Sequence, residues 1–208
     1  MEKKIHSILY IGVVLLLTSV GNSQDKLRTV EKGKYTYHNE PLVIVSRELG
    51  NRPFLNDTQV KGDQNWLKDL RLGIKNISKK TITYFDIELV IEKQGRLTSK
   101  VSISLEFGRS EPILDATGKS TGEYRRKVLN PGEIVKVSVS DNKVLFWGKY
   151  LKENEAADFD SVSVDIREVD YDDGTGWTLG DETREDPNYP GSRVRISRPS
   201  ISRVPNFR

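Results

Sequence analysis

The densest group of side chains that could do chemistry is the segment Asp170–Trp177, which reads Asp-Tyr-Asp-Asp-Gly-Thr-Gly-Trp. Carboxylates beside a glycine are typical of calcium loops, and the candidate ligands are Asp170, Asp172 and Asp173. An EF-hand loop has its glycine at position six, whereas counting from Asp170 places Gly174 at position five. The spacing therefore disfavours a calcium site, which remains an alternative.

The same segment fits a β-hairpin better. A three-residue loop, Asp172-Asp173-Gly174 with a left-handed glycine, would place Val169 opposite Trp177. Both side chains would then face the core, as the register of a half-buried sheet requires. We therefore predict a hairpin here.

Two further groups of carboxylates could supply acid–base chemistry. Hydrolysis of a glycosidic bond needs two carboxyl groups across a cleft, one of them with a pKa raised by burial. Neither group adjoins a pattern that predicts an apolar pocket, so a solvated acidic surface is favoured, and an envelope polysaccharide hydrolase is the alternative. The groups are Glu153, Glu155, Asp158 and Asp160, and Asp181, Glu182, Glu185 and Asp186.

Other catalytic chemistry is scarce in the sequence. The chain has no cysteine and two histidines, His6 and His38, so a Ser-His-Asp relay or a zinc site has almost nothing to build on. Gly174-Thr175-Gly176 lies in the predicted hairpin rather than between a strand and a helix, which argues against a phosphate loop. We therefore predict no catalytic residue and no cofactor. Each tryptophan adjoins an apolar period and is expected in the core rather than on a sugar-binding platform; these are Trp66, Trp147 and Trp177.

The elements that must position these residues are mostly strands. Apolar side chains alternate with polar ones through 70–75, 85–92, 101–107, 135–139 and 162–166, which is the period of strands buried on one face. The apolar phase shifts after Ile166, so a bulge is expected near Arg167-Glu168. Asp141 or Asn142 would cap a short helix running to about Leu151. The pattern predicts an all-β, antiparallel immunoglobulin-like or fibronectin-III-like sandwich with one short helix.

The N-terminus has the three-part layout of a secretory signal peptide. Lys3 and Lys4 precede an apolar run from Ile8 to Leu17, which is shorter than a membrane span, and small residues precede a cut near Gln24. We therefore expect export to the periplasm or the extracellular space. The predicted divisions are a signal peptide (1–23), a leader or linker (24–40), a β-sandwich domain (41–190) and a basic tail (191–208).

Charge restricts the partners. The chain has 33 Lys and Arg and 30 Asp and Glu, a formal net charge of +3, which argues against a dedicated nucleic-acid binder. The tail has arginines and prolines and would either contact an anionic surface weakly or fold back on the acidic stretch between Glu153 and Asp173. The arginines are Arg193, Arg195, Arg198, Arg203 and Arg208.

Several segments resemble a known set of proteins. Trp66–Leu70 with Lys75–Ile82, Leu129–Glu133 and Asp172–Trp177 are similar to the WLKxL…KNxSxKxI, LxPGE and DDGTxW patterns of uncharacterised exported bacterial β-sandwich proteins. The resemblance runs from about Trp66 to Pro190. It implies a shared sandwich fold, and that family brings no established activity with it.

The expected function is therefore that of an exported, non-enzymatic binding or interaction module. Its partner would be an envelope or extracellular protein or a glycan. Sandwich folds host many unrelated functions, so the fold does not name the ligand. The alternatives are the polysaccharide hydrolase and a calcium-stabilised structural domain.

Overall fold

The structure is a computed structural model that describes residues 26–37, 39–54, 58–108, 111–114, 120–125, 127–196 and 204–205. The predicted signal peptide and most of the predicted tail lie outside these residues. The elements are β1 (Lys26–Lys32), β2 (Tyr35–Thr36), β3 (Leu42–Leu49), β4 (Arg52–Phe54), β5 (Gln59–Gly62), the 3-10 helix η1 (Trp66–Asp69), β6 (Leu70–Asn76), β7 (Ile82–Ile91), β8 (Val101–Phe107), β9 (Glu111–Leu114), β10 (Ser120–Arg125), β11 (Ile134–Ser138), α1 (Asp141–Glu153), β12 (Ser161–Tyr171), β13 (Thr175–Thr178), β14 (Asp181–Asp186), β15 (Tyr189–Arg195) and β16 (Val204–Pro205).

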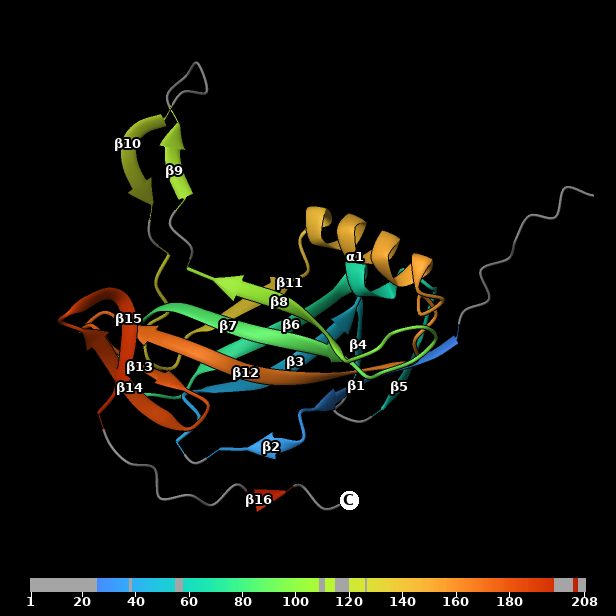
Figure 1. The fold of residues 1–208 in the computed structure, drawn as a ribbon, viewed down its shortest axis with the longest axis horizontal. Coiled ribbons are helices and arrows are strands. Elements are labelled where there is room, and N and C mark those ends of the chain that lie inside the picture. The colour runs from blue at the N-terminus through green and yellow to red at the C-terminus, as the bar shows by residue number, and fades with distance from the viewer. Residues whose placement is uncertain are drawn as a thin grey trace, which may run out of the picture.

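Two main sheets make up the body of the fold (Figure 1). The eight-stranded sheet follows the order β15-β14-β13-β12-β1-β5, with β7 pairing β12 and β8 pairing β7. The four-stranded sheet follows the order β11-β6-β3-β4. Two smaller ribbons pair β9 with β10 and β2 with β16. Figure 1 shows the β9–β10 ribbon standing away from the two sheets.

The alternating side chains of both sheets meet in one core. Buried residues from the two sheets belong to a single hydrophobic cluster. Five strand residues sample it: Val137 is 8 % exposed, and Leu72, Ile87, Ile103 and Val164 are 3 % exposed or less. The mostly-β, two-sheet prediction is therefore confirmed, and the arrangement is sandwich-like. The five residues expected to share this interior, and found there, are Leu72, Ile87, Ile103, Val137 and Val164.

The predicted hairpin and bulge are both present. Strand β12 ends at Tyr171 and β13 begins at Thr175, so the loop has three residues, and Gly174 has a φ of 77°. Val169 pairs with Trp177 across the hairpin. The register of β12 against β7 shifts between Ile166 and Glu168, as the exchange of apolar phase predicted.

The strand arrangement differs from the expectation in two ways. The large sheet is mixed rather than antiparallel, because β1 runs parallel to β12; these strands are far apart in sequence, so no tight turn forces them to be antiparallel. Residues 26–36, assigned to a leader from their polarity, hold β1 and β2, and Val30 is fully buried.

Helix α1 matches its prediction closely. It begins one residue after Ser140, which occupies the N-cap position in place of the predicted Asp141 or Asn142. Ser140 has the extended backbone of an N-cap, with a φ of −68° and a ψ of 151°, and makes no side-chain capping hydrogen bond. The described residues contain no helix that is long and apolar enough to cross a membrane. Strand β15 contains Val194 of the predicted tail, and Val204-Pro205 pair with β2.

Candidate functional site

Helix α1 is fixed to the body by its inner side chains and by one lysine. Leu151 is buried, and Val144 and Trp147 are partly buried against the core. Lys143 Nζ donates to the backbone oxygen of Ser104 at 2.8 Å and lies 3.2 Å from Glu106 Oε1, both on β8. A helix of 13 residues is marginal alone, so these contacts set its position.

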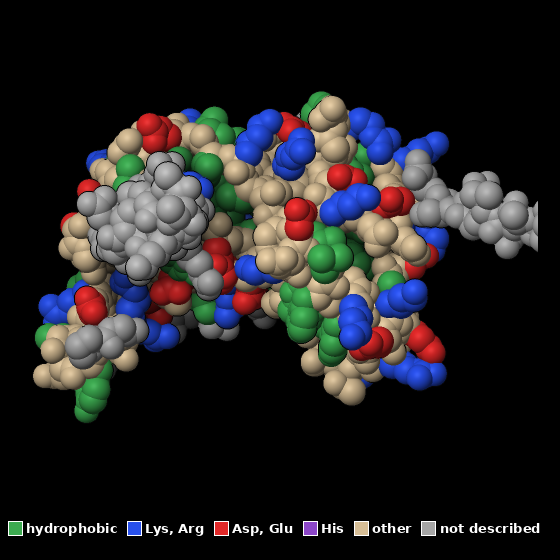
Figure 2. Space-filling view, turned by 90° about the horizontal axis from the view of Figure 1, so that it is seen from above, with side chains coloured by type: hydrophobic (Ala, Val, Ile, Leu, Met, Phe, Trp, Pro, Cys, Tyr) green, Lys and Arg blue, Asp and Glu red, His purple; other side chains and the backbone are tan. Residues whose placement is uncertain are grey.

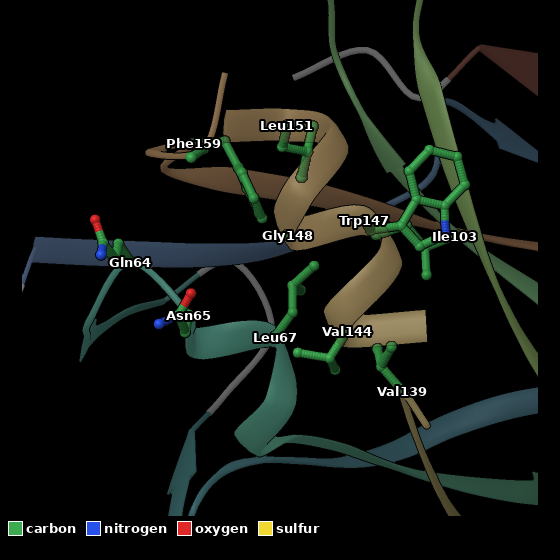
Figure 3. A pocket seen from close by; sticks show the side chains of 11 residues that line it. Gln64, Asn65, Leu67, Ile103, Val139, Val144, Trp147, Gly148, Leu151 and Phe159 are labelled. Carbon is green, nitrogen blue, oxygen red and sulfur yellow. The ribbon is translucent and has the colours of Figure 1, made fainter. Parts of the chain in front are cut away.

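A small apolar pocket lies beneath α1 (Figure 3). Its volume is about 50 Å³, and its walls come from α1, η1, β8 and the segment that precedes β12. Figure 3 shows Leu151, Leu67 and Phe159 directed into this space, with Gln64 and Asn65 at one end. The walls can therefore surround an apolar group, and the two amides can offer hydrogen bonds at its edge.

Gly148 forms part of the pocket wall from within the helix. Apart from the adjacent residues and the helix's own backbone, no atom lies within 4 Å of the position that a Cβ would occupy there. Glycine costs about 1 kcal/mol relative to alanine inside a helix, and the surrounding protein gives no steric reason for it here. The glycine leaves the helix backbone open to a molecule from outside.

The outer side of α1 is unusually apolar for an exposed surface. Leu145 is 72 % exposed and Phe146 is 64 % exposed. Phe146 packs edge-on against Trp147 with ring centres 5.2 Å apart, and Trp147 packs against Tyr150 at 5.6 Å. Figure 2 shows hydrophobic side chains at the surface on this side of the molecule, among scattered Lys and Arg. We call Leu145, Phe146, Trp147, Gly148 and Tyr150 the α1 face.

The tryptophans follow the core prediction in two cases out of three. Trp66 is 1 % exposed and Trp177 is 2 % exposed, so neither can stack on a sugar. Trp147 only partly follows it, because one side packs on the core and the other lies in the α1 face.

The first acidic group is held by cations. Arg28, 1 % exposed, donates to Asp158 Oδ1 at 2.9 Å and to Asp160 Oδ1 at 3.2 Å. The pKa of Asp158 lies below its usual value because of hydrogen bonds from Lys26 and Arg28, which outweigh its partial burial. Glu155 pairs with Arg96 at 2.6 Å. A carboxylate with a lowered pKa is a poor general acid.

The second acidic group is divided among different contacts. Asp181 is 6 % exposed and pairs with Arg195 at 2.6 Å. Asp186 accepts the backbone N–H of Asn188 at 2.8 Å. Glu182 lines a pocket with no other member of the group. The structure therefore does not assemble these carboxylates into a catalytic pair.

Two of the three candidate calcium ligands pair with different cations, and the third, Asp172, is exposed. Asp170 pairs with Arg193, and Asp173 Oδ2 lies 2.8 Å from Lys80 Nζ. Hydrogen bonds from Lys80 and Thr175 lower the pKa of Asp173 to about 2. Within the described residues, no three His, Cys, Asp or Glu side chains are grouped so that they could hold a metal ion.

The structure brings together one carboxyl pair that the sequence did not indicate. Glu40 and Asp165 line the same pocket of about 230 Å³ between β3 and β12. Burial raises the pKa of Asp165, and nearby Arg167 opposes that shift. Asp165 Oδ1 lies where a Cβ on Gly33 would be, so this carboxyl needs a glycine beside it. Glu40 Oε1 accepts the backbone N–H of Tyr37 at 3.0 Å.

The α1 face could have been found from the sequence. Phe146 and Tyr150 are four residues apart and lie off the Val144, Trp147 and Leu151 stripe that anchors the helix. Apolar residues outside the buried stripe, together with a glycine inside a helix, indicate an exposed surface that another molecule covers.

Comparisons of the chain with known protein families, with curated proteins and with solved structures found no match.

Proposed function

We propose that this protein is an exported, non-enzymatic interaction module that binds a protein partner through the α1 face. The observation that carries the proposal is an exposed cluster of aromatic and aliphatic side chains on α1, which shares Trp147 and Gly148 with the wall of an apolar pocket. The signal-peptide pattern and the resemblance to exported sandwich proteins support export and an immunoglobulin-like architecture.

The chemistry of the α1 face favours a protein over a lipid surface or a glycan. Lys143 pairs with Glu106, and Lys149 lies 3.9 Å from Glu153, so the helix is not a strongly basic surface. Phe, Tyr and Trp are enriched in protein interfaces, where a few anchors fill pockets. The pocket of about 50 Å³ fits the end of one apolar side chain.

Site-specific photo-crosslinking tests this proposal. A photoreactive phenylalanine analogue at position 146, in protein produced and exported by its own cells, is expected to form a discrete adduct with one protein. The control position is Tyr189, which is 68 % exposed on β15, at the end of the molecule away from α1 (Figure 1). Equal adducts at 146 and 189, or lipid adducts alone, would contradict the proposal.

Substitution of Gly148 separates binding from stability. Gly148→Leu should stabilise the protein by about 0.5–1 kcal/mol, because leucine is a better helix former than glycine. It should also cover or fill the pocket. Partner binding should then weaken by at least about tenfold, which is the loss of affinity typical when an anchor residue of an interface is removed. Thermal melting and binding to the crosslinked partner measure the two effects. Tyr189→Leu is the matched control and should leave binding unchanged.

A second function is favoured by one specific observation. Asp165, with its pKa raised by burial, and Glu40 share a pocket, as an acid and a base in glycoside hydrolysis would. If they hydrolyse envelope polysaccharide, purified protein releases reducing ends, and Asp165→Asn abolishes this while the melting temperature is kept. The interaction module predicts no release from either protein.

A further inference from the structure

A larger pocket lies at the end of the molecule away from α1. Its volume is about 420 Å³, and its walls are the turn after β6, the β12–β13 hairpin, β14 and the segment before β3. Figure 1 shows β13 and β14 at this end. The pocket shares no lining residue with the pocket beneath α1.

Hydrogen bonds join two of the segments that form the walls of this pocket. Asn76 is fully buried, and its side chain holds the turn through hydrogen bonds to Ser78, Lys80 and Leu129 of 2.7–2.9 Å. Lys80 joins the turn to the hairpin, because its Nζ donates to Thr175 Oγ1 at 2.7 Å. The same ammonium lies 5.1 Å from the centre of the Tyr171 ring. A ligand would meet a preformed site.

Two opposite charges line the pocket without pairing. Within the described part of the chain, the side chains of Lys79 and Glu182 form no ion pair and no hydrogen bond. Glu182 is the cross-strand partner of Trp177, so both side chains lie on the same face of the sheet. The pocket therefore offers one cation and one anion to a ligand.

A buried donor in the same wall also lacks an acceptor. Trp177 is 2 % exposed, and its Nε1–H finds no hydrogen-bond acceptor among the described residues. The ring is fixed by edge-on packing against Tyr37, with centres 5.8 Å apart. Buried polar groups are nearly always satisfied, so an unsatisfied N–H in a pocket wall indicates an acceptor supplied from outside.

Apolar side chains complete the site. Ile77 is 54 % exposed and Ile196 is 47 % exposed, and both line this pocket. Such exposed isoleucines would gain from contact with an apolar group of a ligand.

We infer that this pocket binds a small zwitterion with an apolar side chain, that is, an amino acid or a short peptide. The ligand's carboxylate is received by Lys79 and the Trp177 N–H, its ammonium group by Glu182, and its side chain by Ile77 and Ile196. This site is separate from the α1 face and stands whether or not the α1 face binds a protein.

Calorimetric titration with leucyl-leucine, its N-acetyl form and its C-terminal amide tests the inference. The free dipeptide should bind, and each blocked form should bind at least about tenfold more weakly, because it lacks one charged hydrogen-bonding group. Glu182→Gln should lose the preference for the free over the acetylated form. Lys79→Met should lose the preference for the free over the amidated form. Glu153→Gln and Lys149→Met, on α1, are the matched controls.

Trp177→Phe tests the buried donor, since it keeps a ring and removes the N–H. Affinity for the free dipeptide should fall several-fold while the thermal transition stays cooperative. The inference is overturned if no form binds at millimolar concentration, if all three forms bind equally, or if affinity in Trp177→Phe is unchanged.

Discussion

Replacing Arg28 with methionine should lower the free energy of unfolding by about 2–4 kcal/mol, because several acceptors lose the buried cation that binds them. Its guanidinium donates to the backbone oxygens of Phe159 at 2.7 Å and Gly62 at 3.1 Å, besides Asp158 and Asp160. These contacts join β1 to the end of β5 and to the segment before β12. Methionine keeps the length of the side chain and offers no donor. Thermal and urea unfolding at neutral pH measure the loss.

Arg96→Met is the matched control for Arg28. Arg96 forms an ion pair with Glu155 at 2.6 Å, with both side chains more than half exposed. Exposed pairs contribute about 0–1 kcal/mol, so this variant should melt close to the wild type. If the two variants lose the same stability, the Arg28 contacts do not hold these segments together.

Acid should narrow the difference between Arg28→Met and the wild type. The pKa of Asp158 is lowered in the folded protein, by Lys26 first and Arg28 second. A carboxyl with a lowered folded pKa contributes stability above its unfolded value and loses it as pH falls through the folded value. The difference in unfolding free energy between the two proteins should shrink as the pH falls below about 4, the usual pKa of an aspartate. It should not vanish, because the bonds to the two backbone oxygens do not titrate.

Asn76→Ala should cost about 2–4 kcal/mol, since four side-chain hydrogen bonds and a buried volume are lost together. The Nδ2 group donates to the backbone oxygens of Lys80 and Leu129, each at 2.9 Å. The Oδ1 atom accepts from the backbone N–H and the hydroxyl of Ser78. The turn that carries Lys79 and Lys80 should loosen, and dipeptide affinity at that pocket should fall with stability.

Asn76→Asp and Asn51→Ala refine this prediction. Aspartate has nearly the same shape but points a second acceptor at two backbone oxygens, and burial should raise its folded pKa. Asn76→Asp should therefore be unstable at neutral pH and regain stability as pH falls through that raised pKa. Asn51 is exposed, so Asn51→Ala should change stability by less than about 0.5 kcal/mol. An Asn76→Ala variant as stable as Asn51→Ala would contradict the role given to this turn.

Local sequence signals predicted the features that depend on neighbouring residues. The hairpin register of Val169 and Trp177 and the bulge before Glu168 follow from where apolar side chains must point. Helix α1 was predicted from the apolar stripe of Val144, Trp147 and Leu151 and from the polar residues Asp141 and Asn142 that precede it. The parallel pairing of β1 with β12 was missed because nothing local encodes a contact between segments so far apart. Residues 26–32 are mostly polar, and of their two apolar side chains, Leu27 and Val30, only Val30 is buried, so the segment gave little sign of a buried strand.

The candidate sites were predicted less well than the fold. The acidic groups were identified as residue types, yet their partners come from other strands: Arg28 from β1, far away in the sequence, and Arg195 from β15, the strand next to β14. The pairing of Glu40 with Asp165 in one pocket likewise depends on the meeting of β3 and β12. Pockets form where elements meet, so a sequence pattern with a local period does not reveal them.

Methyl-resolved NMR tests the central claim most directly. The methyl signals of the protein are recorded before and after addition of the purified partner that photo-crosslinking identified. If the pocket beneath α1 receives an apolar side chain of that partner, the methyl signals of Leu67, Ile103, Val144 and Leu151 shift on binding, and Gly148→Leu abolishes the shifts. If the partner binds and these signals stay unchanged while methyl groups of Ile77 and Ile196 shift, the α1 face is not the binding surface.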